Sequence, residues 1–207
     1  MIKVLAVASL ALLSADAYTA KDREDTNDWI KSQGFPLLDA FTNMTPKMTK
    51  TVFETYARVT NNDAFEYLDA FDLEIIYTAV SAANNCELCL SFHAAVLVPQ
   101  SDKVSAEDVN EIVQGGLPKD TRLRGLVQAA KYALAHKGAL LPREISHLKF
   151  HGIDSQEHFL EIAFAAGFMS ANNMIYIHMI NNGQDLEEFL QNVGPFKDTV
   201  YSGKGEL

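Results

Sequence analysis

The sequence predicts an all-α protein, a multi-helix bundle of about eight to ten helices, and three observations support this prediction. Apolar residues recur at helical spacing along most of the chain, whereas the strict alternation of half-buried strands is hard to find. Cap residues, Gly and Pro divide the chain into segments of helical length. Hydrophobic residues make up 48% of the 207 residues, enough to bury a substantial core.

In the first half of the chain, each expected segment is bounded by a cap residue or a helix breaker. Thr19 can cap the first helix, and Pro46 suits the first turn of a later one. Asn84 and Asn85 interrupt the longest apolar helix of this half and are expected to cap the helix that follows. The expected segments are 19–32, a short apolar piece at 37–41, 45–56, 65–83 and 86–97.

In the second half of the chain, cap residues and glycines again bound the expected helices. Ser105 begins a segment with a capping-box-like start, Gly138 and Gly152 stop two others, and Ser155 caps the longest one. The expected helices are 105–115, 120–136, 142–150, 155–183 and 185–191.

Two stretches of the chain resemble each other weakly. Glu-Ile-Ile at 74–76 and Ala-Asn-Asn at 83–85 are echoed by Glu-Ile-Ala at 161–163 and Ala-Asn-Asn at 171–173. Two related helical halves would leave such a trace. Chance similarity between two amphipathic helices would leave the same trace, so both interpretations stay open.

The N-terminal segment 1–17 differs from the rest of the chain. Lys3 precedes an apolar run over 4–13, and 15–17 has the small-x-small form of a cleavage site. The run is too short to span a bilayer, which requires about 20 apolar residues. We expect either a signal peptide, which slightly favours a periplasmic or secreted location over a cytoplasmic one, or an apolar N-terminal helix. A single all-α domain is expected over 18–207.

The net charge of −10 argues against a nucleic-acid partner, because phosphate binding requires clustered Lys and Arg. The chemistry of the chain is concentrated elsewhere. Its only two cysteines fall within the pattern Glu74-x11-Cys86-x-x-Cys89-x-x-x-His93. On a helix the last three residues share one face, where two thiols can close a small disulfide and an imidazole can accept a thiol proton. Glu74 stands among apolar residues, and a buried carboxylate needs a partner.

The residue pattern alone does not decide which thiol is the nucleophile. A helix N-terminus lowers a thiol pKa, which favours Cys86, whereas a neighbouring base favours Cys89. A zinc site made by Cys86, Cys89, His93 and Glu74, or a purely structural helical module, is the alternative from another class of protein. Structural zinc sites usually draw on two separated ligand pairs, and this argues against the metal.

With these spacings, the pattern from Glu74 to His93 resembles the redox branch of the alkylhydroperoxidase D-like, carboxymuconolactone decarboxylase superfamily, most strongly over 46–98. The resemblance implies an all-α bundle of that type, a homo-oligomer, and a thiol-dependent antioxidant enzyme that acts as a peroxidase or disulfide reductase. It also implies roles: Cys89 attacks, Cys86 resolves, His93 is the base and Glu74 orients it. No haem, flavin or metal cofactor is implied. The implied partners are a hydroperoxide and a thiol or dithiol reductant protein, with no membrane span.

One position departs from the family pattern. The best-studied branch has a histidine immediately before its second cysteine, and this chain has Leu88 there. The departure leaves peroxidase efficiency and the natural reductant undefined, and a protein disulfide oxidoreductase without peroxide chemistry is the alternative enzyme. The decarboxylase branch lacks the cysteine pair, so its lyase activity is not implied.

The remaining histidines are assigned no chemistry. His147 and His151 lie four residues apart near a helix end, and we expect solvent exposure rather than metal binding. His136 is expected to complement the C-terminus of its helix.

Overall fold

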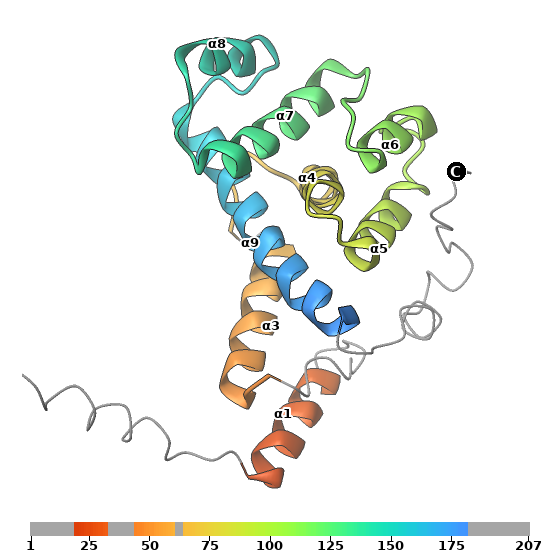
Figure 1. Cartoon of the computed structure of the whole chain (residues 1–207), viewed down its shortest axis with the longest axis vertical. Helices are drawn as coiled ribbons and strands as arrows, with labels where there is room; N and C mark the ends of the chain where they lie inside the picture. Colours follow the sequence, from red (N-terminus) through yellow and green to blue (C-terminus); the bar gives the residue numbers. More distant parts are fainter. Residues whose placement is uncertain (1–18, 33–43, 61–63, 182–207) are drawn as a thin grey trace, which may run out of the picture. The chain divides into compact units, whose positions relative to one another are not determined.

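The computed structural model describes residues 19–32, 44–60 and 64–181. Within them the chain forms eight α-helices and no strand, which confirms the predicted all-α class (Figure 1). The chain divides into two compact units, 1–55 and 56–207. The expected segments 1–17, 37–41 and 185–191 lie outside the described residues, so the N-terminal assignment and the domain boundary stay predictions.

The first unit contains helix α1 (Ala20–Ser32) and most of α3 (Pro46–Thr60). Thr19 caps α1 as predicted: its hydroxyl accepts the Asp22 N–H at 3.1 Å, and the Asp22 carboxylate accepts the Thr19 N–H at 2.9 Å. Pro46 is the first residue of α3, also as predicted, and this helix extends beyond Tyr56 to Thr60.

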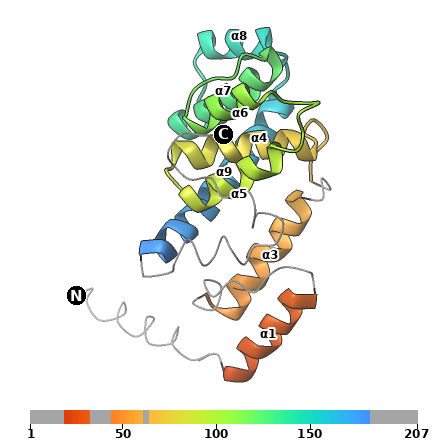
Figure 2. The ribbon, with the colours of Figure 1, turned by 90° about the vertical axis from the view of Figure 1, so that its right-hand side faces the viewer.

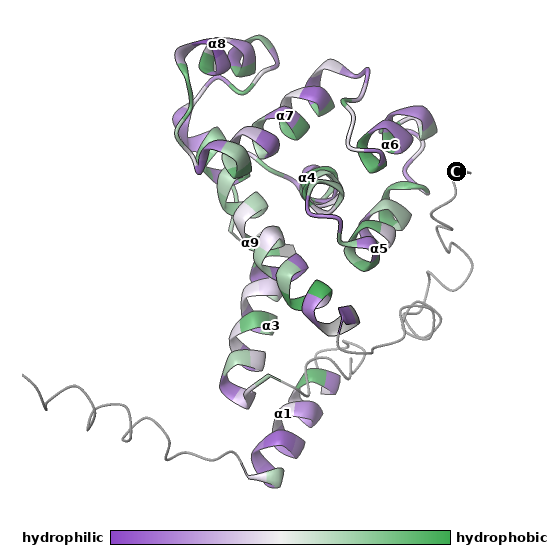
Figure 3. Cartoon of the chain, in the orientation of Figure 1, coloured by the Kyte–Doolittle hydropathy of each residue, from purple (hydrophilic) through white to green (hydrophobic). Residues whose placement is uncertain are grey.

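The second unit is built around helix α4 (Ala70–Ala83). This helix packs against α5 (Glu87–Leu97), α6 (Ala106–Val113), α7 (Thr121–His136) and α9 (Gln156–Asn181), and the two views in Figures 1 and 2 show it among them. Most of the residues of α4 are buried, as expected for a helix that is apolar on nearly all sides. Helix α6, in contrast, is amphipathic: its apolar side faces α4 and its opposite side is hydrophilic (Figure 3). Helix α4 is therefore the central helix of this unit, and α5, α6, α7 and α9 pack around it.

Helix α4 begins later than predicted, at Ala70 rather than near residue 65. The Asp69 carboxylate accepts the Asp72 N–H at 2.8 Å and caps the helix at this point. Two backbone N–H groups just before the cap, at 66 and 67, donate to the Glu161 carboxylate of α9, each at 2.8 Å. These long-range bonds hold the preceding residues outside the helix.

Replacing Asp69 with Ala is expected to lower the free energy of unfolding by about 1 kcal/mol, because the first turn of α4 loses its cap acceptor. Urea denaturation measures the change. The control is Asp102→Ala, which removes an exposed carboxylate from the turn between α5 and α6. An equal loss in both variants would show that the cap contributes nothing specific.

The remaining boundaries follow the predictions closely. Ser105 and Asp120 cap α6 and α7, and α8 (Pro142–Phe150) packs against α7. The two similar stretches differ in local structure, since Asn84 ends α4 whereas its counterpart Asn172 is buried inside α9.

Among the described helices, none combines the length and the apolar character that a membrane crossing requires.

Candidate functional site

The turn between α4 and α5 sets the position of the first cysteine. Asn84 is the C-cap of α4, and Asn85 adopts the left-handed region at φ 54°, which Asn tolerates better than most residues. The prediction that these asparagines cap α5 is therefore wrong. Cys86 occupies the N-cap of α5, and its N–H donates to the Ser81 carbonyl at 3.0 Å. Cys86 thus lies at the N-terminal end of α5, one residue before its first turn.

Glu74 and His93 come together between α4 and α5. The His93 Nδ1 lies 2.8 Å from the Glu74 Oε2, and the two side chains are only 4% and 16% exposed. An ionised carboxylate can only accept, so the histidine carries a proton on Nδ1 and, when neutral, a lone pair on Nε2. The contact orients the ring and prepares its second nitrogen to accept a proton.

Both cysteines are free, buried thiols. The Cys89 thiol donates a hydrogen bond to the Cys86 sulfur, and this bond lowers the pKa of Cys86. The Cys89 N–H favours the Cys86 anion in the same direction, although it does not form a full cap hydrogen bond. Burial raises the pKa of Cys89. In the reduced pair, therefore, negative charge is more stable on Cys86 than on Cys89.

Three tyrosines from three different helices lie near these groups. The Tyr77 ring of α4 lies 5.1 Å from the His93 ring, and its hydroxyl is buried with no hydrogen-bond partner in the structure. Burial raises the pKa of Tyr56, Tyr77 and Tyr176, and the charges of Glu74 or of the cysteines add to the effect. These phenols therefore remain protonated donors around the thiol pair.

None of the three tyrosines was predicted from the sequence as a site residue. Only Tyr77 carries a signal that could have found it, because it lies three residues after Glu74 and so shares one face of α4 with it. Tyr56 and Tyr176 come from distant segments and reach the site through tertiary packing. Leu88, at the position that departs from the family pattern, is buried in the core.

The geometry does not favour the zinc alternative. In the described part of the chain, no three or more His, Cys, Asp or Glu side chains gather closely enough to hold a metal ion. Glu74 instead pairs with His93, and the two thiols pair with each other.

Two predictions about the other histidines have different outcomes. The predicted exposure of His151 is wrong, because its side chain is buried and its Nε2 lies 3.2 Å from the His147 Nε2. His136 lies in the last turn of α7, as predicted, and also pairs with the Glu144 carboxylate at 3.1 Å.

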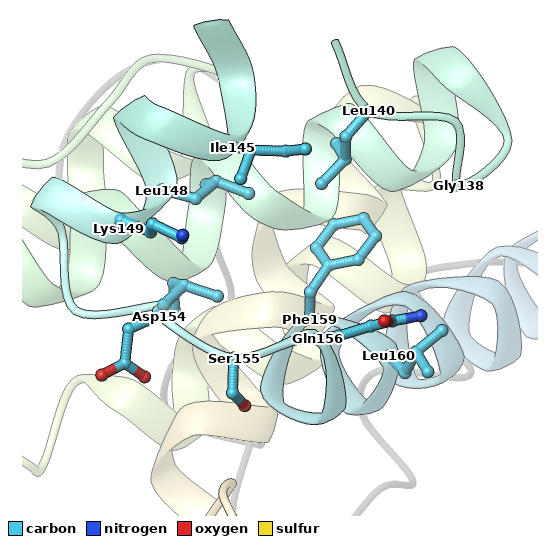
Figure 4. A pocket seen from close by; sticks show the side chains of 11 residues that line it. Gly138, Leu140, Ile145, Leu148, Lys149, Asp154, Ser155, Gln156, Phe159 and Leu160 are labelled. Atoms are coloured by element: carbon cyan, nitrogen blue, oxygen red, sulfur yellow. The ribbon is translucent and has the colours of Figure 1, made fainter. Parts of the chain in front are cut away.

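A cavity of about 440 Å³ opens between α8 and α9, away from the cysteines (Figure 4). Leu140, Ile145, Leu148 and Phe159 point toward one another across it, and Lys149 lies at its edge. Its lining includes none of the residues from Glu74 to His93. This cavity is therefore not part of the thiol site.

Residues 50–131 match the carboxymuconolactone decarboxylase family, which includes the alkylhydroperoxidase D-like proteins. The match confirms the family expected from the sequence and extends past the region of strongest resemblance, into α7. It contains Glu74, both cysteines, His93 and two of the three tyrosines. No curated protein matches the chain.

Proposed function

We propose that this chain, whose residues 50–131 match the carboxymuconolactone decarboxylase family, is a thiol-dependent peroxidase that reduces small hydroperoxides. The observation that carries the proposal is the 2.8 Å Glu74–His93 contact, one turn of α5 away from Cys89 in a hydrogen-bonded pair of buried thiols. An oriented base next to a nucleophile whose resolving partner is already in contact is the arrangement that thiol peroxidase chemistry requires.

In the proposed first step, the proton of Cys89 moves to His93 and the thiolate sulfur attacks one oxygen of the hydroperoxide. The S–O bond forms as the O–O bond breaks, and the departing alkoxide takes the proton from His93. Cys89 is thereby oxidised by two electrons to sulfenic acid, and the hydroperoxide is reduced to an alcohol.

In the second step, Cys86 attacks the sulfenic sulfur and forms the Cys86–Cys89 disulfide. The hydroxyl group leaves with the thiol proton as water. An external dithiol then restores both thiols and is itself oxidised to a disulfide.

The order of the two thiols is the part of the proposal that draws on the family resemblance. The lowered pKa of Cys86 opposes this order in the reduced pair, because it makes negative charge more stable on the resolving sulfur than on the attacking one. His93 lies one turn further along α5 and can take the Cys89 proton. This transfer produces the Cys89 thiolate even though Cys86 is the more acidic thiol of the pair. The reverse order, with Cys86 attacking, is the specific alternative.

Burial favours a small hydroperoxide over the disulfide of a partner protein. Cys86 is 0% exposed and Cys89 is 2% exposed, and the hydroxyls of Tyr56 and Tyr176 lie near enough to be affected by the charge of Cys89. A small peroxide needs only a narrow path to this site, whereas the disulfide of a partner protein, like the proposed reductant protein, can react only when the sulfurs become accessible to it. The enclosed site therefore supports peroxidase activity more strongly than protein disulfide reduction. A homo-oligomeric state and a reductant protein remain part of the proposal through the family resemblance.

A peroxidase assay that is driven by dithiothreitol tests the function directly. The protein is expected to consume hydrogen peroxide and small alkyl hydroperoxides only when reductant is present. Mass spectrometry after one equivalent of peroxide, without reductant, should show loss of two hydrogens from the peptide that spans Cys86 and Cys89. Reduction of a protein disulfide without any peroxide turnover would instead favour the oxidoreductase alternative.

A further inference from the structure

A second pair of reactive side chains lies at the end of α8, outside the region that matches the family. The imidazoles of His147 and His151 face each other with their Nε2 atoms 3.2 Å apart and their ring planes at 87°. His151 is 7% exposed, and the Nδ1 of His147 is buried without a partner. The proposed peroxidase chemistry uses neither residue.

The backbone of α7 fixes which nitrogen of His151 carries its proton. The His151 Nδ1 lies 2.9 Å from the Thr121 carbonyl oxygen, which can only accept, so this nitrogen is the donor. The Nε2 of the neutral ring then carries a lone pair, and this nitrogen lies 3.2 Å from the His147 Nε2. A histidine whose outer nitrogen donates to a backbone carbonyl is the form that metal sites use, because the hydrogen bond fixes the tautomer and the ring orientation.

Helix α7 is shaped to receive this histidine. A Cβ atom added at Gly125 would lie 2.8 Å from the His151 Cβ and 2.9 Å from its carbonyl oxygen. Gly125 therefore permits an approach that any side chain would block. His151 is held by close packing as well as by its hydrogen bond, and the ring geometry is built into the fold.

We propose that His147 and His151 form a chelating site for a divalent transition-metal ion of the zinc type. Zinc–imidazole bonds of about 2.0–2.1 Å at a tetrahedral angle place the two nitrogens about 3.3–3.4 Å apart. The observed separation of 3.2 Å is close to this value. The i, i+4 spacing along α8 is also the one by which a helix presents two histidines to one ion. Water completes the coordination, since no third His, Cys, Asp or Glu side chain of the described residues joins the pair.

Zinc binding to the full-length protein tests the proposal, in a background that carries Cys86→Ser and Cys89→Ser so that thiols cannot bind the ion. Isothermal titration with Zn²⁺ alone should show one ion per chain. Adding His147→Gln should weaken binding by at least about tenfold. The control is His178→Gln, at an exposed position on α9, which should leave binding unchanged. His147 is the better position to vary because it is less buried than His151.

Nitrogen-15 NMR of the histidine rings separates the proposed site from a simple hydrogen bond between the two rings. Zn²⁺ should shift the Nε2 resonances of His147 and His151 together, with no change at His178. Absence of Zn²⁺ binding would overturn the proposal, and so would binding that His147→Gln does not weaken. Because no readout depends on peroxide turnover, the outcome is independent of the proposed enzymatic function.

Discussion

Cys89→Ser is expected to abolish peroxide consumption, whereas Cys86→Ser is expected to retain a single turnover. Without Cys89 no sulfur attacks the peroxide under the activating influence of His93. Without Cys86 the attack still occurs, but the sulfenic acid that forms has no neighbouring thiol to resolve it. Stopped-flow measurement of peroxide loss gives the stoichiometry, and trapping of the sulfenic acid with dimedone, followed by mass spectrometry, identifies the modified residue.

The chain is well suited to this experiment because it contains no other cysteine. Any trapped sulfenic acid must therefore belong to the thiol that remains. Ser91→Ala, on the same helix and also buried, is the control for packing changes in α5. The opposite pattern, with single turnover in Cys89→Ser and none in Cys86→Ser, would assign the attack to Cys86. That result would mean that the lowered pKa of Cys86 decides the order of the two thiols.

The fold was predictable from the sequence because its helices are marked locally. Cap residues such as Ser105, Asp120 and Ser155 hydrogen-bond to amides a few residues away, so their effect can be read from a short window. The start of α4 was not predictable in the same way. Glu161, from the far end of the chain, accepts the N–H groups that precede Asp69, and no local window contains that contact.

In the candidate site, too, the residues that lie close together along the chain were predictable, and those brought in by tertiary packing were not. The residues from Glu74 to His93 lie on two consecutive helices, so their spacing carries most of the geometry. Tyr56 and Tyr176 reach the site only through packing, and no regular spacing along the chain connects them to Cys89. The same holds for His151, whose burial depends on Gly125 and on the Thr121 carbonyl of a different helix.

Replacing Glu74 with Gln is expected to lower kcat/KM for peroxide by about 100-fold. The amide oxygen can still accept the His93 Nδ1–H, so the ring keeps its orientation. The amide carries no charge, however, and cannot stabilise the imidazolium that forms when His93 takes the thiol proton. The matched control is Glu157→Gln, which removes the same charge from an exposed position in the first turn of α9. It should change kcat/KM by less than about twofold.

A double-mutant cycle then tests whether Glu74 acts through His93. His93→Gln alone should lower kcat/KM by about 10²- to 10⁴-fold, the usual contribution of a general base. If Glu74 works only by charging and orienting this ring, then Glu74→Gln should have little further effect once His93 is gone. Two losses that multiply in full would show that Glu74 acts on the thiols or the substrate directly. The relay from Glu74 through His93 to Cys89 would then have to be abandoned, even if both residues proved essential.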